Sequence, residues 1–155
     1  MNGGMAIAAV MALAVPAATL SGDKAQFFSG HEVQAQLAQL APQARAHGSS
    51  GSNLASYGNL SLKLSLRSAS GGAEIHARYD DLMIVQQGSA TLMTGGTVED
   101  AQVSSDGETR GTSVKDGTAR TITAGDVVVV PAGVPHQLLI PPGTLYSALV
   151  AKVKE

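Results

Sequence analysis

Residues 125–136 read GDVVVVPAGVPH, and this stretch decides the fold that we expect for the chain. The β-branched run Val127–Val130 contains no polar residue, which predicts a strand that is buried on both faces. Pro131 ends the pairing of that strand, and Gly133 can adopt the positive φ that a tight turn requires. The stretch therefore predicts a strand, a rigid turn and a second strand that begins near His136.

The second strand places a single histidine on a face that we expect to be buried. His136, Leu138 and Ile140 alternate with Gln137 and Leu139, so the first three share one face. A histidine on an apolar face suits either a hydrogen-bonded core residue or a ligand of a bound group. The residues of this strand alone leave both alternatives open.

The spacing from Gly125 to His136 resembles the second conserved motif of the cupin superfamily, G-x5-P-x-G-x2-H, although Ile140 stands where that motif usually has Asn. The first cupin motif is approximately G-x5-H-x-H-x3,4-E-x6-G, and residues 72–88 read GAEIHARYDDLMIVQQG. The resemblance covers about residues 54–154. It implies an all-β fold, a jelly-roll barrel of the cupin type. We expect a short N-terminal helix to pack outside this barrel.

Counting back from Gly88 assigns the positions of the first motif. Asp81 falls at the carboxylate position, and His76 and Arg78 fall at the two histidine positions, with one residue missing between Arg78 and Asp81. The resemblance then implies that His76, Asp81 and His136 are metal ligands. Two histidines and one carboxylate suit iron, manganese, nickel or zinc. Arg78 cannot ligate a metal because a guanidinium does not lose its proton.

Three arrangements are compatible with Arg78 at this position. In the first, Arg78 points outward or pairs with Asp80, and the metal is bound. In the second, the metal is lost, and Arg78 with His76 and His136 binds a small carboxylate or phosphate. In the third, Arg78 and Asp81 form a structural ion pair in a barrel without a ligand.

Further residues near the first motif are candidates for contact with a ligand. Arg78, Met83 and Tyr79 are the candidate ligand-binding residues, although Met83 also suits the barrel core. Glu74 and Tyr146 join Tyr79 as candidates for proton transfer, and nothing in the sequence selects one of the three.

Composition limits the kinds of partner. The chain has 155 residues, a formal charge of −2, a pI near 6.0, 3% aromatic residues and no cysteine. This length fits one small domain. The slightly acidic, aromatic-poor composition argues against the basic, aromatic surface that is typical of nucleic-acid binding. We expect a small-molecule ligand, no nucleic acid, no membrane contact after removal of a signal peptide, and a homodimer as is common among cupins.

The N-terminal region differs from the rest. Met5–Leu20 is an apolar run that is too short to span a bilayer, and small residues surround Pro16. We therefore predict a signal peptide in residues 1–20 and a periplasmic or secreted protein. We assign residues 21–53 to a helix and linker, and residues 54–155 to the barrel.

Local patterns predict the elements around the motifs. Ser29 and Glu32 form a capping-box pattern, which predicts a helix that runs to about Ala41, before Pro42. Leu60–Arg67 alternates leucine with polar residues, as in a strand with one buried face. Gln87 and Gly88 predict a hairpin between Leu82–Gln86 and Ser89–Met93. Gly95–Thr118 is polar and predicts an inserted loop with at most a short strand.

Two functional hypotheses follow. As an enzyme, the protein would be a metal-dependent cupin of the dioxygenase or isomerase type, whose metal polarises a substrate oxygen or activates water or dioxygen. As a binding module, it would hold a small polar molecule without chemistry.

Overall fold

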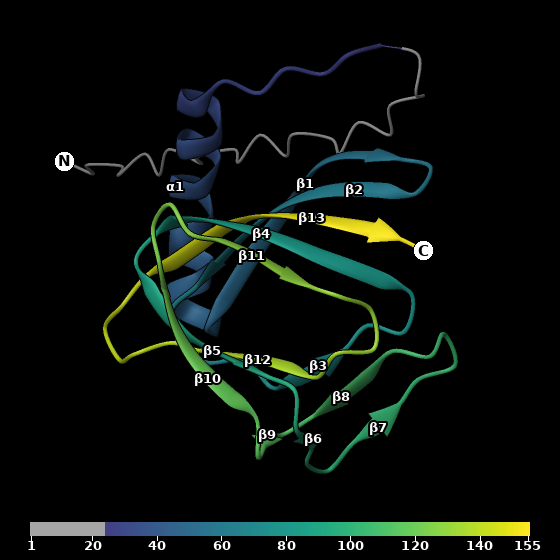
Figure 1. The fold of residues 1–155 in the computed structure, drawn as a ribbon. Helices are drawn as coiled ribbons and strands as arrows, with labels where there is room; N and C mark the ends of the chain where they lie inside the picture. The colour runs from purple at the N-terminus through teal and green to yellow at the C-terminus, as the bar shows by residue number, and fades with distance from the viewer. Residues whose placement is uncertain (1–23) are drawn as a thin grey trace, which may run out of the picture.

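The computed structural model describes residues 24–155, which form a jelly-roll β-barrel of two antiparallel sheets with one helix outside (Figure 1). The first sheet contains, in spatial order, β1 (Ser49–Tyr57), β2 (Leu60–Arg67), β13 (Tyr146–Lys154), β4 (Tyr79–Gln87) and β11 (Val127–Val130). The second contains β10 (Thr118–Thr123), β5 (Ser89–Thr94), β12 (His136–Leu139), β3 (Ala73–Ile75), β8 (Thr109–Gly111) and β7 (Gln102–Val103). A small third sheet pairs β6 (Thr97–Val98) with β9 (Val114–Lys115).

The expected jelly-roll barrel with an outer helix is thus confirmed. The strand β1 begins at Ser49, so the barrel starts earlier than residue 54. The predicted signal peptide, residues 1–20, lies outside the described residues. Within residues 24–155, no helix combines the length and hydropathy needed to cross a membrane.

The helix α1 (Gly30–His47) begins as predicted and ends later than predicted. Ser29 and Glu32 form the capping box, and Gly48 ends the helix with a φ of 86°. The predicted end near Ala41 is wrong because the helix continues through Pro42. Proline removes one hydrogen bond inside a helix, but Ala44 in the following turn is fully buried against the sheet, which offsets that loss.

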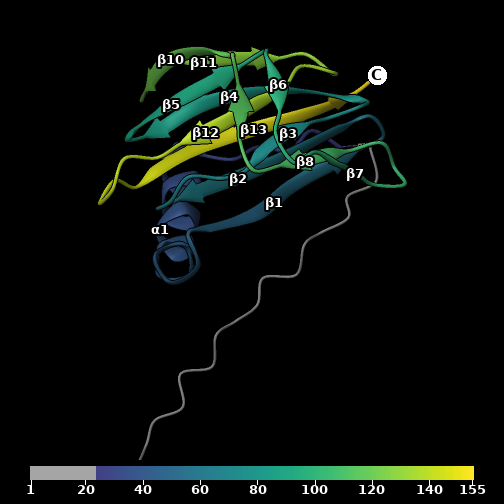
Figure 2. The same cartoon turned by 90° about the horizontal axis from the view of Figure 1, so that it is seen from below.

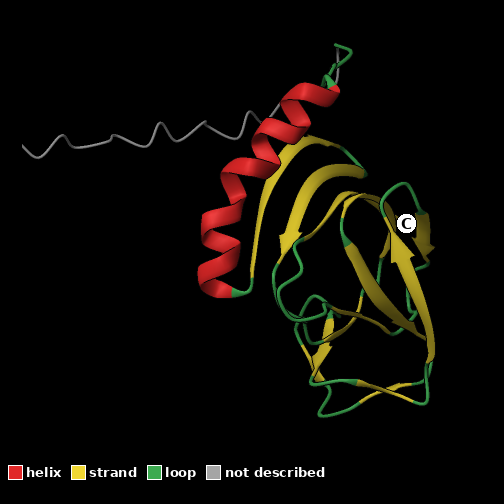
Figure 3. Cartoon of the chain, turned by 90° about the vertical axis from the view of Figure 1, so that its left-hand side faces the viewer, coloured by secondary structure: helices red, strands yellow, loops and turns green. Residues whose placement is uncertain are grey.

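The leucine face of β2 packs against this helix rather than inside the barrel. Leu64 and Leu66 are buried in a cluster with Val33, Leu37 and Ala44 of α1. Figure 3 shows the helix lying on the outer side of the strands, and Figure 2 places it beside β1 and β2, away from β11. By strand alternation, the polar face of β2 is turned into the barrel.

A separate apolar core fills the barrel. It consists of buried residues from both sheets: Met83, Val85, Ala90, Leu92, Ile122, Val130, Ile140, Tyr146 and Ala148. Alternate residues of β4 and β13 therefore point inward. The same inner faces also carry polar residues, Asp81 on β4 and Lys152 on β13.

The run Val127–Val130 is an edge strand, which corrects the prediction that both its faces are buried. Val127 and Val129 are 63% and 59% exposed, whereas Val130 is buried in the core. Among residues 24–155, strand β11 pairs only with β4 and ends its sheet. The turn that follows agrees with the sequence, because Gly133 has a φ of 77°.

The predicted hairpin at Gly88 is also wrong. Strand β4 pairs with β11 and β13, and strand β5 pairs with β10 and β12, so the turn carries the chain from one sheet to the other. Gly88 has a φ of 75°, and a side chain there would lie 2.1 Å from the carbonyl oxygen of Leu145. The tight turn at Gly88 is therefore present, but it connects two strands of different sheets and not the two strands of a hairpin.

The segment Gly95–Thr118 is more ordered than the inserted loop that we predicted. It contributes four short strands, β6 to β9, of which β8 pairs with β3. Each is only two or three residues long, too short for a local pattern to reveal, and β8 joins the segment to the barrel by pairing with β3. This segment brings Glu108 to the site described next.

Candidate metal centre

A cavity of about 260 Å³ lies inside the barrel, between the polar face of β2 and the start of β12. Its wall combines charged and polar side chains with a few apolar ones. The ionisable side chains of the lining are those of Lys63, Arg67, Glu74, His76, Asp81, His136 and Lys152.

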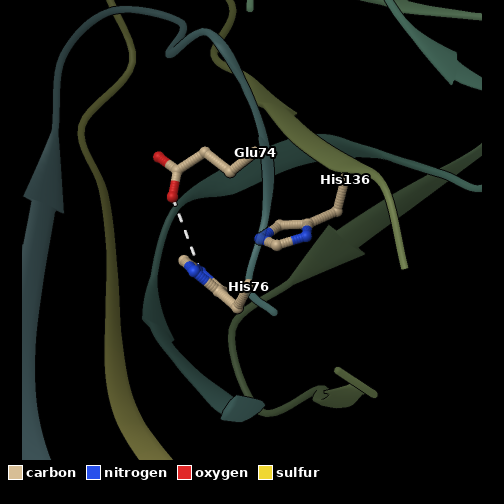
Figure 4. A group of neighbouring side chains, drawn as sticks. All are labelled: Glu74, His76 and His136. Carbon is tan, nitrogen blue, oxygen red and sulfur yellow. Dashed lines mark ion pairs between the residues drawn. The ribbon is translucent and has the colours of Figure 1, made fainter. Parts of the chain in front are cut away.

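Three of these side chains converge on one another: Glu74, His76 and His136 (Figure 4). Glu74 on β3 lies directly opposite His136 on β12, and His76 follows Glu74 by two residues on the same face. One ligand atom from each of the three lies within 4.8 Å of the others. Glu74 Oε2 is 3.5 Å from His76 Nε2, and the imidazole centroids are 5.1 Å apart.

His136 is set up as a neutral ring with one free nitrogen. Its Nδ1 donates a hydrogen bond to the carbonyl oxygen of Val134 at 3.0 Å, so Nε2 keeps its lone pair. Burial lowers the pKa of His136, which favours the neutral form. A neutral imidazole with a fixed tautomer is the form that binds a metal.

His76 is oriented in a similar way by a carboxylate from the 95–118 segment. Its Nδ1 is bonded to Glu108 Oε2, which leaves Nε2 for the cavity. The hydrogen bond with Asp81 raises the pKa of His76, burial lowers it, and Glu108 raises it further, with a net increase. A carboxylate behind a histidine is the usual outer partner of a metal-binding imidazole.

Asp81 and Lys152 complete the charged lining. Asp81 Oδ2 lies 3.2 Å from His76 Nε2, and Asp81 Oδ1 accepts a hydrogen bond from Lys152 Nζ at 2.7 Å. Lys152 Nζ is also 2.8 Å from His76 Nε2. Burial raises the pKa of Asp81, but the hydrogen bonds from His76 and Lys152 outweigh it and lower the pKa. Asp81 is thus charged and already paired.

The sequence motifs select neither Lys152 nor Glu74, and Glu74 is only one of three candidates for proton transfer among which the sequence does not choose. Alternation with His76 is a signal for Glu74, because residues two apart share a face of a strand. Alternation along β13 also places Lys152 on the inward face that carries Tyr146 and Ala148. Which inward residues meet across the barrel depends on strand order, which local patterns do not give.

The structure suggests a different alignment of the first motif. If Glu74 takes the first histidine position and His76 the second, four residues separate His76 from Asp81, and six separate Asp81 from Gly88. No residue is then missing. Arg78 falls in the spacer, and its side chain is exposed, with Nη2 donating to the carbonyl oxygen of Asp106 at 3.1 Å.

The other predicted ligand-binding residues lie in different places. Met83 lines the cavity beside Asp81. Tyr79 lines a separate depression of about 300 Å³ near Tyr57. Ligand binding by Arg78, Met83 and Tyr79 stays a prediction, but only Met83 of the three lines the cavity. Burial raises the pKa of Tyr146 to about 12, so this residue is a poor proton acceptor near neutral pH.

Comparisons with known proteins find similarity in structure but not in sequence. No family model matches the chain, and no curated protein matches it. The polyketide cyclase RemF from Streptomyces resistomycificus aligns with a TM-score of 0.51 and 18% identity, over 70% of this chain and 67% of that one. The DMSP lyase DddQ from Ruegeria pomeroyi DSS-3 aligns with a TM-score of 0.51 and 17% identity, over 71% of this chain and 49% of that one.

A cupin superfamily protein from Desulfitobacterium hafniense DCB-2 aligns with a TM-score of 0.49 and 17% identity, over 70% of this chain and 80% of that one. This chain spans about half the length of DddQ. Identities this low concern the fold alone. The structural alignments with RemF and DddQ, together with the barrel topology and the motif at residues 125–136, show that the chain has the cupin fold.

Proposed function

We propose that this protein is a small-molecule-binding cupin that holds a divalent metal ion through Glu74, His76 and His136. The observation that carries the proposal is the state of the two imidazoles. Each Nδ1 is engaged, by Glu108 in His76 and by the carbonyl of Val134 in His136, so each Nε2 is turned to the cavity, where that of His76 also contacts Lys152 and Asp81. Two such nitrogens and a carboxylate that lie within 4.8 Å of one another are a compact donor set.

The donor set fits a transition metal rather than calcium or magnesium. Imidazole and carboxylate together suit iron, manganese, nickel or zinc, whereas the harder cations prefer oxygen ligands alone. Such an ion would act as a Lewis acid toward an oxygen of the bound molecule. The chain's own residues orient the imidazoles, and Met83, Leu138 and Val150 give the cavity its apolar wall.

Lys152 is the group that a metal must displace. Its ammonium lies 2.8 Å from His76 Nε2, the nitrogen that we assign to the metal. The predicted ligand Asp81 is held by the same ammonium at 2.7 Å. We therefore propose Asp81 as an additional ligand only when Lys152 moves away from it.

The test is the metal content of full-length protein purified without chelator or added metal. We expect about one iron, manganese, nickel or zinc ion per chain, because imidazole and carboxylate donors suit these metals. His136→Ala should lose the ion. His31→Ala should keep it, because His31 is exposed on α1. Absence of metal together with no binding on titration, or full binding by His136→Ala, would exclude the metal site.

A second function is favoured by the same ammonium. Lys152 already supplies a positive charge between Asp81 and His76, so the barrel could bind a small polar molecule without any metal. Under this alternative, metal analysis gives no bound ion, while ligand binding persists in the presence of chelator.

Export is a further proposal that rests on the apolar run Met5–Leu20 alone. N-terminal sequencing of the protein from the periplasm or culture medium would test it. We expect a mature chain that begins shortly after residue 20; an unprocessed chain in the cytoplasm would contradict export. The homodimer stays a prediction.

A further inference from the structure

We infer that the molecule bound in this cavity carries a carboxylate, and that Arg67 binds it. This inference deepens the proposed function, because it names the chemical class of the ligand that would lie beside the metal centre. Its basis is the positive charge of Arg67 in the cavity wall, which has no ion-pair partner among residues 24–155.

Arg67 is the last residue of β2 and lines the cavity in a half-buried position. Its side chain forms no ion pair or hydrogen bond with any residue between 24 and 155. The two carboxylates in the same wall are both engaged elsewhere. Glu74 pairs with Arg110 at 2.9 Å and with His76, and Asp81 pairs with Lys152 and His76. Within the part of the chain that the structure describes, Arg67 and Lys63 are therefore the two cations of the wall without a partner, and of these Arg67 is the half-buried one, whereas Lys63 is exposed.

The guanidinium of Arg67 rests on the backbone of Gly71, another residue of the cavity wall. A side chain at Gly71 would place its first carbon 2.7 Å from Nη1 and 3.2 Å from Cζ of Arg67. The absence of a side chain thus makes room for the head group itself. Because the charged end of Arg67, and not only its aliphatic stem, lies against this wall, it is placed for contact with a ligand.

Gly71 is held rigidly on both sides. Its N–H donates to the carbonyl oxygen of Leu138 at 3.1 Å, and its carbonyl accepts a hydrogen bond from Gln137 Nε2 at 2.8 Å. Gln137 is buried, and its Oε1 accepts a hydrogen bond from the N–H of Val114. This support fixes the surface on which the guanidinium lies, and a pre-organised donor loses less entropy when it binds.

The ligand class follows from this arrangement. A guanidinium donates two parallel hydrogen bonds to a planar carboxylate. A phosphate presents three oxygens and needs further donors, whereas the nearby N–H of Gly71 is already used by Leu138. Lys63 also lines the cavity, in an exposed position that attracts anions toward it. The cavity volume of about 260 Å³ limits the ligand to a small molecule.

The test is calorimetric titration of full-length protein, as purified, with acetate, glutarate and benzoate. We expect at least one of them to bind, and Arg67→Met to weaken that binding by about tenfold or more, because a charge-assisted bidentate contact is lost. Arg67→Lys should be intermediate. Arg120→Met is the matched control: it removes an arginine that is exposed on β10 and absent from the cavity wall, so binding should stay within about twofold of the wild type.

Two further measurements keep the result interpretable if Arg67→Met folds poorly. Gly71→Ala retains Arg67 but displaces its head group, so it should weaken carboxylate binding while the metal content is unchanged. Glutaramide, which has the shape of glutarate without its charge, should not bind measurably.

Three outcomes would overturn the inference: no binding of any of the three carboxylates, equal losses in Arg67→Met and Arg120→Met, or binding of inorganic phosphate alone. The metal proposal is judged separately in the same samples. Carboxylate binding that depends on Arg67 in a protein without metal would retain this inference and reject the metal centre.

Discussion

Lys152 and Asp81 lie directly opposite each other on β13 and β4, and the ammonium of Lys152 donates to Asp81 at 2.7 Å while it also contacts Nε2 of His76. The candidate metal centre therefore contains a cation of its own. An ammonium and a divalent ion at neighbouring positions repel each other, and the repulsion is stronger in a partly buried site than in water. Occupancy by metal and the position of Lys152 are coupled.

Replacement of Lys152 by methionine should strengthen metal binding. Removing the like charge should increase the affinity for zinc by about tenfold or more. Titration calorimetry of chelator-treated protein would measure this change. Lys154→Met, on the same strand but outside the cavity wall, is the control and should bind zinc as the wild type does. A weaker affinity in Lys152→Met would mean that Lys152 supports the metal rather than opposing it.

The two histidines should titrate in opposite directions from the usual value. The hydrogen bond with Asp81 raises the pKa of His76, whereas burial lowers the pKa of His136. NMR titration of the imidazole signals in chelator-treated protein would measure both. Asp81→Asn should lower the pKa of His76, and Asp80→Asn, whose carboxylate accepts from the N–H of Ala132, should leave it unchanged. A His76 pKa below that of His136 would contradict the assigned hydrogen bonds.

Asp81 should make stability depend on acid pH. The pKa of Asp81 is lowered below 3.8 in the folded chain, so its contribution to the free energy of unfolding is present above that value. The contribution is lost as the pH falls through the folded-state pKa. Urea unfolding at about pH 6 and about pH 3 should show that Asp81→Asn is destabilising at the higher pH and much less so at the lower one. An equal difference at both would mean that ionisation of Asp81 is not the cause.

Glu108 should act on the metal through His76. Glu108→Gln replaces the carboxylate behind Nδ1 with a neutral amide, and outer partners of this kind typically contribute about 10- to 100-fold to metal affinity. Zinc titration would measure the loss. Glu99→Gln is the matched control, because Glu99 lies in the same segment and bonds to Ser113 instead. Equal zinc affinities in the two variants would show that Glu108 does not support the metal centre.

Gly133 should be required for its backbone conformation alone. Gly133→Ala should reduce the free energy of unfolding by about 1–2 kcal/mol, because a left-handed φ is costly for other residues. No described residue lies within 4 Å of the position of the added carbon at Gly133 or at Gly30, and of these two glycines only Gly133 has a positive φ. Gly30→Ala is therefore the control and should be neutral or slightly stabilising in urea unfolding. Equal effects would show that φ at Gly133 is not limiting.

The parts of the fold that the sequence predicted depend on short segments. The turn at Gly133, the cap at Ser29 and the alternation in β2 follow from steric and hydrogen-bonding preferences over a few residues, and the structure contains all three. The exposure of Val127 could not be predicted in the same way. It depends on β11 being the end of a sheet, which is set by the order of distant strands.

The candidate site likewise contains residues that local spacing predicts and residues that it does not. Motif spacing identifies His136 and His76, and their surroundings agree with a site. Lys152 is 71 residues from Asp81 in the chain, and nothing local pairs the two. Glu108 reaches His76 from a segment that we predicted as a loop. Strand order and long-range pairing thus determine the electrostatics of the cavity, while local spacing determines only the imidazoles.

The two faces of β2 have different roles, one in packing and one in lining the cavity. Leu64 and Leu66 pack against α1 on the outer side and hold the strand in place. The inner side chains are therefore not required for an apolar core; they are Lys63, Ser65 and Arg67. Exchanges at those three positions can therefore alter which molecule the barrel accepts at little cost to folding. A scaffold built in this way can acquire a new ligand one inner residue at a time, while the helix outside keeps the strand in place.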